Sequence, residues 1–482
     1  MSHMNRRQFL KRSLAAAGGA FAIGGTDVFG RVLGANETIR VGVAGLNGRG
    51  SSHVDAFTKM KGVEVVYLID PDTRTFGGRI QQVEGRGGRR PACVQDVRKA
   101  LDDQDVDVLS IATTNHWHSL ITIWACQADK DVYVEKPLSH NVHEGRIAVE
   151  MARKHNRIVQ HGTQSRSSGG KARVAALIRS GKLGKLLVSR GLCYKPRGSI
   201  GLKPTSPPPA ELDFNLWLGP AREQPHHANL VHYNWHWFWD FGNGDIGNQG
   251  VHEMDIARWA IPGATLPRSV VSLGGRFGYV DQGETPNTQI ALFDFGETQL
   301  IFEVRGLKTD GFRGEKVGNV FHLESGTIVG DKHFIPKGSE KPEPLPKLDV
   351  ALPERPGGGH FENFIACVRS RKVEDLAADV LDGHYSSALC HLANISVRLG
   401  EEAPFDPRTK AFGENKDAYE ALERAEEHLA TGNGIRLDGL KYRLGRKLAV
   451  DAKAETIAGD PEAAKLLTRA CRAPFVVPER VV

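Results

Sequence analysis

The spacing of apolar and polar residues divides this chain into two regions with different periodicities. Between residues 38 and 160, short apolar runs typical of buried strands alternate with helical patterns, as in consecutive βαβ units. From 268 to 335, two-fold alternation dominates and favours strands with one covered face. We therefore expect an α/β protein, with an N-terminal doubly wound parallel (Rossmann) sheet and a C-terminal α+β domain built on a large, open, mostly antiparallel sheet.

A chain of 482 residues is too long for one hydrophobic core, so several domains are expected. The open face of the second sheet favours a homodimer or homotetramer. Beyond it lie amphipathic helical patterns at 416–429 and 461–471, in a segment that could cap the substrate pocket or contact another subunit. The divisions we expect are a signal peptide at 1–35, a dinucleotide-binding domain at 36–160, a substrate and oligomerisation domain at 161–400 and a C-terminal helical extension at 401–482.

The N-terminus has the pattern of a twin-arginine export signal. Arg6 and Arg7 precede Phe-Leu-Lys, and the weakly apolar run at 14–25 is too short to span a membrane permanently. Twin-arginine export carries folded proteins, so it suits one that takes up its cofactor in the cytoplasm. We expect a periplasmic or otherwise exported protein with no membrane span when mature. Without residues 1–35 the formal charge falls from +6 to +2, which gives no case for a nucleic-acid partner.

The first strand ends in a Gly-rich turn, and a helical pattern follows it from Ser51. Strand, turn and helix in this order form a dinucleotide site, where glycines let the backbone approach a pyrophosphate at the helix N-terminus. Asn47 stands where the second glycine usually lies, and asparagine tolerates positive φ. The second strand ends at Asp70, whose carboxylate would bind the ribose hydroxyls of NAD and repel the 2′-phosphate of NADP. The turn comprises Gly45, Leu46, Asn47, Gly48, Arg49 and Gly50.

Two further motifs follow strands and fall on the same rim of the sheet. With the turn and Asp70, the runs Thr-Thr-Asn-His-Trp-His (113–118) and Glu-Lys-Pro (135–137) resemble the Gfo/Idh/MocA oxidoreductase family. The resemblance implies that Lys136 lies near the nicotinamide and the substrate hydroxyl, and that a cis bond often precedes Pro137. A lysine there lowers the pKa of a sugar hydroxyl and can share in proton relay. The further residues expected to hold NAD are Thr113, Thr114, Asn115, His118, Glu135, Lys136, Pro137 and Gln164.

The family pattern Asp-x-Gly-x-His-x-x-Asp-x-x-x-Trp has a counterpart at 248–259. His252, Asp255 and Trp259 match it, whereas Asn248 stands where the first Asp is expected. An amide cannot accept a proton, so Asn248 can only orient the substrate, and His252 becomes the best general base. The catalytic residues expected are Lys136, His252, Asn248 and Asp255.

Aromatic residues crowd the stretch 232–240 and could stack on sugars, although aromatics at this density are more often core. We expect no metal at His116, His118, His226 and His227, because the sequence identifies no third ligand for the His-x-His pair. The six cysteines show no Cys-x-x-Cys pair, and one or two disulfides are possible. The residues expected to bind substrate are His116, Trp117, Tyr194, Trp235, Trp237, Trp239 and His252.

Three hypotheses of function follow. The first is an exported NAD-dependent oxidoreductase that transfers hydride between a ring C–OH of a sugar, polyol or glycoside and a tightly held nicotinamide. Little free NAD exists outside the cytoplasm, so the cofactor must be re-oxidised by a second substrate or restored within one turnover. The second is a redox glycosidase similar to glycoside hydrolase family 109, although the Tyr-Pro-Thr-His-like run of that family is absent. The third is a non-catalytic sugar-binding protein, against which Lys136, His252 and Asp70 argue.

Overall fold

The computed structural model describes residues 38–348, 352, 354–406 and 409–481, so the predicted export signal lies outside the described residues. The N-terminal domain is a six-stranded parallel sheet in the order β3-β2-β1-β4-β5-β6. The order reverses between β1 and β4, which is where doubly wound sheets bind ligands. The predicted Rossmann arrangement is confirmed. Its strands are β1 (Ile39–Ala44), β2 (Val63–Ile69), β3 (Ala92–Val94), β4 (Val108–Ile111), β5 (Asp131–Val134) and β6 (Val159–His161).

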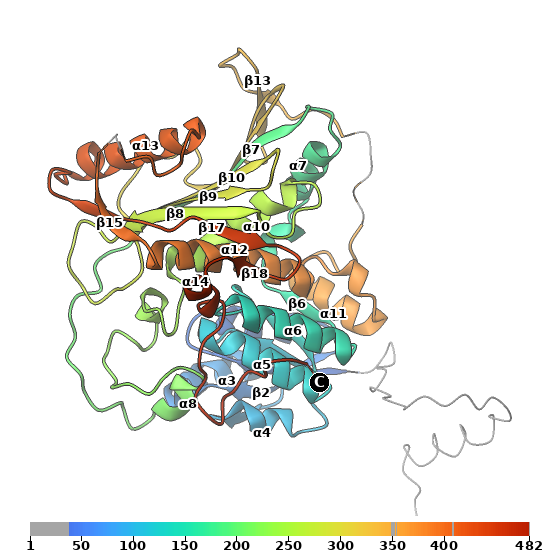
Figure 1. Ribbon diagram of the computed structural model, residues 1–482. Coiled ribbons are helices and arrows are strands. Elements are labelled where there is room, and N and C mark those ends of the chain that lie inside the picture. The colour runs from blue at the N-terminus through green and yellow to red at the C-terminus, as the bar shows by residue number, and fades with distance from the viewer. Residues whose placement is uncertain (1–37, 349–351, 353, 407–408, 482) are drawn as a thin grey trace, which may run out of the picture. The chain divides into compact units, whose positions relative to one another are not determined.

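Helices alternate with these strands along the chain and pack on the sheet (Figure 1), where they bury its apolar residues. All four residues of β4 and of β5 are buried, which explains why these strands are continuous apolar runs rather than alternating ones. Helix α5 carries Leu120 and Ile123 against this sheet. The helices are α2 (Gly50–Lys59), α3 (Phe76–Glu84), α4 (Val97–Leu101), α5 (Asn115–Gln127) and α6 (Val142–Lys154).

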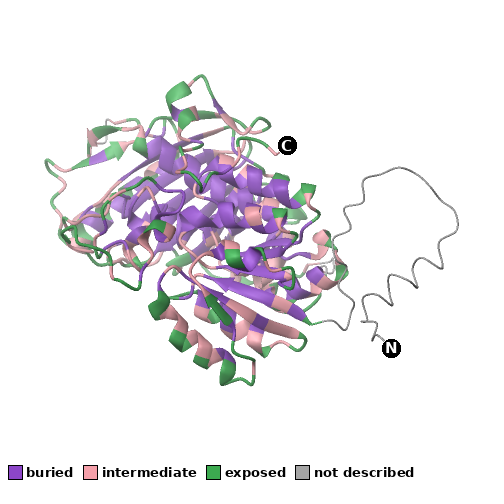
Figure 2. Ribbon diagram, turned by 90° about the horizontal axis from the view of Figure 1, so that it is seen from below, coloured by how far each residue is buried: buried purple, intermediate pink, exposed green. Residues whose placement is uncertain are grey.

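The second sheet has twelve strands and is mostly antiparallel, as predicted, although β7 and β10 run parallel. One face packs on α10 (Gly250–Ala260) and α12 (Val380–Arg398), and Figure 2 shows buried residues running continuously through this centre. Helix α7 (Gly169–Arg179) packs beside α10, whereas α11 (His360–Ser370) packs on the Rossmann domain, with the ring of Phe361 against Tyr133. The strands before residue 350 are β7 (Leu186–Tyr194), β8 (Ser269–Gly275), β9 (Thr288–Asp294), β10 (Gln299–Arg305), β11 (Val317–Leu323), β12 (Gly326–Val329), β13 (His333–Pro336) and β14 (Glu343–Pro344).

The segment after residue 400 contains the two expected helices, α13 (Lys416–Asn433) and α14 (Pro461–Lys465), but it is more than a helical extension. Its strands extend the large sheet beside β8, which the sequence pattern did not predict. The apolar side of α13 covers the sheet face opposite α12, with Leu422 and Leu429 against Ile290 and Ile301 (Figure 1). The face expected to be open is therefore partly covered by the chain itself. The strands are β15 (Glu401–Pro404), β16 (Lys441–Leu444), β17 (Leu448–Asp451) and β18 (Thr456–Ala458).

Two smaller expectations can be compared with the structure. All six cysteines are free thiols, so none of the possible disulfides forms. Across the described ranges, no helix combines the length and apolarity that a membrane crossing requires.

Candidate active site

The Gly-rich turn forms a close-packed cradle at the end of β1. Gly45 has φ +84°, and a Cβ there would lie 2.5 Å from the carbonyl carbon of Ala112. A Cβ on Gly50, the first residue of α2, would lie 1.8 Å from the carbonyl oxygen of Gly45. No described atom lies within 4 Å of a Cβ built on Gly48, so the turn is open on that side. Gly45 has the positive φ of the turn and Asn47 does not, so the tolerance of asparagine for that conformation is not used here.

Asp70 ties the turn to the end of β2. Its Oδ2 accepts the backbone N–H of Leu46 at 2.7 Å, and its Oδ1 accepts the N–H of Asp72 at 2.9 Å. Burial raises the pKa of Asp70 to about 6, although both hydrogen bonds act in the opposite direction. The remaining lone pairs of this carboxylate border the cavity described next and suit ribose hydroxyls.

A cavity of about 550 Å³ lies at this rim of the Rossmann sheet and has the size of a small-molecule site. Two expected cofactor residues do not line it. Gly50 begins α2, and Pro137 follows a cis peptide bond, as the resemblance implied, with its carbonyl 2.6 Å from Nδ1 of His118. The glycine cradle, the helix N-terminus and the acid at the end of β2 fit a dinucleotide. The expected cofactor residues that line the cavity are Gly45, Leu46, Asn47, Gly48, Arg49, Asp70, Thr113, Thr114, Asn115, His118, Glu135, Lys136 and Gln164.

Glu135 organises the polar groups beside the turn. One of its oxygens accepts from Arg49 at 2.8 Å, from Gln164 at 2.9 Å and contacts Nε2 of His53 at 3.2 Å. Burial alone would raise the pKa of Glu135, but the bond from His53 and the charges of Arg49 and Lys136 hold it well below its usual range. The glutamate is therefore ionised and fixes the neighbouring cations in place.

Lys136, Asn248 and His252 converge on the cavity from the two domains. The ammonium of Lys136 donates to the backbone oxygen of Asn248 at 2.8 Å and to its Oδ1 at 3.1 Å. Burial lowers the pKa of Lys136, and Glu135 opposes this shift. Burial and the charge of Lys136 lower the pKa of His252 to about 3. His252 is thus neutral at physiological pH and has a lone pair able to accept a proton.

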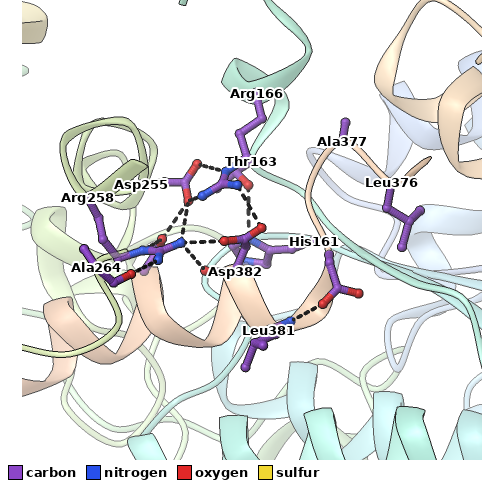
Figure 3. A network of polar contacts seen from close by, with 12 residues as sticks. His161, Thr163, Arg166, Asp255, Arg258, Ala264, Leu376, Ala377, Leu381 and Asp382 are labelled. Atoms are coloured by element: carbon purple, nitrogen blue, oxygen red, sulfur yellow. Dashed lines mark hydrogen bonds and ion pairs between the residues drawn. The ribbon is translucent and has the colours of Figure 1, made fainter. Parts of the chain in front are cut away.

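Asp255 does not line this cavity, and its assignment as a catalytic residue needs correction. The carboxylate is fully buried and accepts a hydrogen bond from Nε of Arg166 at 2.7 Å (Figure 3). It also accepts one from the hydroxyl of Ser386 at 2.6 Å. Arg166 and Arg258 each form a further ion pair with Asp382 at 2.8 Å. The second Asp of the motif therefore joins α10 to α12 and to residues before α7, because a buried charge requires paired partners.

The expected substrate residues divide between the cavity and the core. Trp117, Trp235 and His252 line the cavity. His116 is buried outside it, with Nε2 3.1 Å from the carbonyl of Trp217. Tyr194 lies on the α13 side of the second sheet, where its hydroxyl donates to Glu303 at 2.6 Å. Two other expected residues, Trp237 and Trp239, also lie outside the lining and pack under arginine side chains.

Five lining residues that were not among the expected site residues come from residues 211–236, here called the covering segment. It includes α8 (Phe214–Leu218) and a short 3₁₀ helix, η3 (Asn234–Trp237). Contacts with the Rossmann domain hold it over the cavity: the N–H of Asp213 donates to Pro71 at 2.9 Å, and Nε2 of His232 lies 2.9 Å from Asp72. Its length between β7 and α10 with little regular structure was an available signal. The missed residues of this segment are Leu216, Trp217, His232, Tyr233 and His236, and those outside it are Ala44, Ile69, Pro71, Gln95, Asp96, Val97, Ala112, Ile121, Lys195 and Gln249.

The C-terminal tail, residues 469–478, fastens this covering segment. Arg472 donates to the carbonyl of Gly219 at 3.2 Å and to Oδ1 of Asn215 at 2.5 Å. Phe475 is buried against Trp117, with ring centroids 5.3 Å apart. The tail therefore joins the covering segment to the core of the Rossmann domain.

Comparisons with known proteins agree with this geometry. Residues 39–163 match the NAD-binding Rossmann fold of the Gfo/Idh/MocA oxidoreductase family, and residues 185–270 match an oxidoreductase-family C-terminal alpha/beta domain of the same name. Among curated relatives, a glycosyl hydrolase family 109 protein of Shewanella pealeana is 30% identical over 203 residues, covering 38% of this chain and 44% of the relative. An alpha-N-acetylgalactosaminidase of Shewanella oneidensis is 25% identical, covering 39% and 45%. The chain thus spans less than half the length of these relatives.

Solved structures share the fold at low sequence identity. The WlbA dehydrogenase from Bordetella pertussis, solved with NADH and UDP-GlcNAcA, has a TM-score of 0.54 at 17% identity, covering 74% of this chain and 97% of that one. A levoglucosan dehydrogenase, solved with NADH and levoglucosan, has a TM-score of 0.52 with the same identity and coverage. These likenesses establish the architecture.

Proposed function

We propose that this chain is an oxidoreductase of the Gfo/Idh/MocA type that transfers hydride between a ring C–OH of a carbohydrate and a retained NAD. The matches of residues 39–163 and 185–270 to models of that family support the proposal. The observation that carries the proposal is the convergence of Lys136, Asn248 and His252 on the cavity that the Gly-rich turn and Asp70 also line. A non-catalytic sugar-binding protein would not need a buried lysine and a neutral histidine beside a dinucleotide cradle.

Each residue has a role that follows from its surroundings. NAD, when bound, supplies the hydride acceptor. Lys136 directs its ammonium to the substrate oxygen and favours the alkoxide-like charge that develops there. His252, being neutral, accepts the hydroxyl proton. Asn248 holds Lys136 through two hydrogen bonds and orients the substrate.

Retention of the cofactor is supported by the covering segment. Its contacts with Asp72 and Pro71 lie next to Asp70, at the ribose end of the cavity. Arg472 of the C-terminal tail also holds the segment by donating to the carbonyl of Gly219. We infer that these contacts must open before a dinucleotide is released. A retained cofactor suits a protein that works where free NAD is scarce.

A second function, a redox glycosidase, is favoured by the names of the curated relatives, which are glycosyl hydrolase family 109 proteins and an alpha-N-acetylgalactosaminidase. In that reaction, oxidation of a ring carbon precedes elimination of the leaving group, addition of water and return of the hydride. The substrate would then be a glycoside rather than a free sugar.

Export and assembly form part of the proposal. The twin-arginine pattern at Arg6 and Arg7 predicts an exported, periplasmic protein, which fractionation of cells carrying the wild type and R6K/R7K would test. Because α13 covers part of the large sheet, a homodimer or homotetramer would have to use the rest of that face or another surface.

One experiment tests the central proposal and separates the two reactions. Purified protein with bound NAD is mixed with free sugars and with nitrophenyl glycosides while nicotinamide absorbance is recorded. A lasting rise with free sugars, reversed by a second carbonyl substrate, is expected for the oxidoreductase. A transient rise with glycosides and release of nitrophenol indicates the glycosidase. Failure to bind NAD would exclude both.

A further inference from the structure

His236 is a second imidazole of the cavity. It lies in η3 of the covering segment and lines the cavity with Lys136 and His252. Its Nδ1 lies 2.5 Å from the carbonyl oxygen of Tyr233. A carbonyl oxygen can only accept a hydrogen bond, so the ring proton resides on Nδ1. The neutral ring therefore carries its free lone pair on Nε2, for which we find no hydrogen-bond partner in the described part of the chain.

The orientation of this ring is fixed by its neighbours. It stacks on Trp235 with centroids 3.6 Å apart and planes 20° apart, and the indole N–H of Trp235 donates to the carbonyl of His232 at 2.8 Å. A Cβ on Gly242 would lie 2.5 Å from the carbonyl oxygen of His236, so the backbone is also closely packed. Burial, with a smaller contribution from Lys136, lowers the pKa of His236 to about 3, which keeps it neutral.

His252 differs from His236 in this respect. Its Nδ1 is buried and has no hydrogen-bond partner among the described residues, so no bond at that nitrogen fixes the tautomer there. Removal of a hydroxyl proton during dehydrogenation requires one base. A reaction that also breaks a C–H bond requires a second base. His236, whose Nε2 is already the acceptor nitrogen, fits that need.

We propose that His236 removes the proton from the carbon adjacent to the transiently oxidised ring carbon. The inference rests on the proposed function, because oxidation to a ketone is what makes that C–H bond acidic. The C–H bond breaks, its electron pair forms a carbon–carbon double bond, the carbonyl pair moves to the oxygen as an enolate, and the proton binds Nε2. Lys136 stabilises the enolate oxygen. In a glycoside with a leaving group on the next carbon, the enolate expels it; in a free sugar, reprotonation exchanges the hydrogen with solvent.

The test uses the full chain with bound NAD in D₂O and glucose, galactose and N-acetylgalactosamine as probes. Nicotinamide absorbance reports hydride transfer, and proton NMR of the sugar reports exchange at the neighbouring carbon. We expect the wild type to do both. In H236N the rate of exchange should fall at least about 100-fold more than the rate of nicotinamide reduction does, because about 100-fold is the usual contribution of a positioned base. The matched variant H252N should instead lose nicotinamide reduction.

Each outcome is decisive. If no sugar reduces the nicotinamide in the wild type, the proposed function fails and this role with it. Reduction without exchange in the wild type, unchanged exchange in H236N, or an equal loss of both signals in H236N would overturn the role of His236 and leave the proposed function standing. ¹⁵N NMR of histidine-labelled wild type needs no variant: the Nδ1–H tautomer is expected, and an Nε2–H tautomer at His236 would refute the inference.

Discussion

Replacement of Asp70 by asparagine tests the cofactor site most directly. D70N keeps the shape of the side chain but removes its charge, and its amide nitrogen cannot accept either of the backbone N–H groups of Leu46 and Asp72. A hydrogen bond to a charged group contributes about 1.5–3 kcal/mol. Loss of one such bond to the ribose should weaken NAD binding by roughly 10- to 150-fold, while NADP, no longer repelled, should bind relatively better.

The raised pKa of Asp70 also predicts how the affinity for NAD depends on pH. NAD favours the ionised carboxylate, so affinity is retained above pH 6 and is lost as the pH falls through the raised pKa of about 6. At pH 5 about a tenth of the free protein is ionised at this site, so NAD should bind about tenfold more weakly than at pH 7. D70N should lack this dependence.

The assay is calorimetric titration with NAD and NADP at both pH values. D96N is the control. Asp96 lines the same cavity, but its Oδ1 accepts a hydrogen bond from Nε of Arg98 at 3.0 Å, so this carboxylate is not expected to bind the ribose. Its NAD affinity should stay within about twofold. If D70N binds NAD as tightly as the wild type does, or keeps the pH dependence, the assignment of Asp70 to the ribose is refuted.

The other predictions concern proton transfer, retention and stability. H252N should lower kcat for nicotinamide reduction by about 10²–10⁴-fold with NAD affinity unchanged, whereas an equal loss in binding would indicate a structural role. Because burial lowers the pKa of His252 to about 3, kcat/KM in the wild type should not fall between pH 7 and 5 through this group, and a pH profile with an acid limb from a histidine near 6.5 would contradict this. R472A removes hydrogen bonds between the C-terminal tail and the covering segment. Loss of about 1.4 kcal/mol corresponds to a tenfold change, so release of bound NADH should be about tenfold faster in stopped-flow fluorescence. An unchanged rate would contradict a role of the tail in retaining the cofactor. D255N leaves the buried Arg166 partly uncompensated and should cost about 3–5 kcal/mol of unfolding free energy in urea titrations, against at most about 1 kcal/mol for the surface control D55N.

Part of the site is local in sequence and could be predicted from it. The turn at 45–50, Asp70, and the motifs at 113–118 and 135–137 each follow a strand directly, and parallel strands bring their carboxyl ends to one rim. The periodicities of 3.6 and 2 likewise determine which segments become helices and strands, because each must bury one face. Most strands of both sheets that lie before residue 330 follow from these patterns.

The tertiary structure alone decided where individual side chains point. Asp255 matches a catalytic pattern, yet its partner Arg166 is 89 residues away and draws it into the core. Of the aromatic stretch, Trp235 and His236 face the cavity while Trp237 packs under Arg197, since no periodicity governs an irregular segment. The strands after residue 400 and the tail that fastens the covering segment also escape the sequence pattern. Short, partly exposed strands have weak alternation, and contacts between remote segments depend on packing that no local pattern specifies.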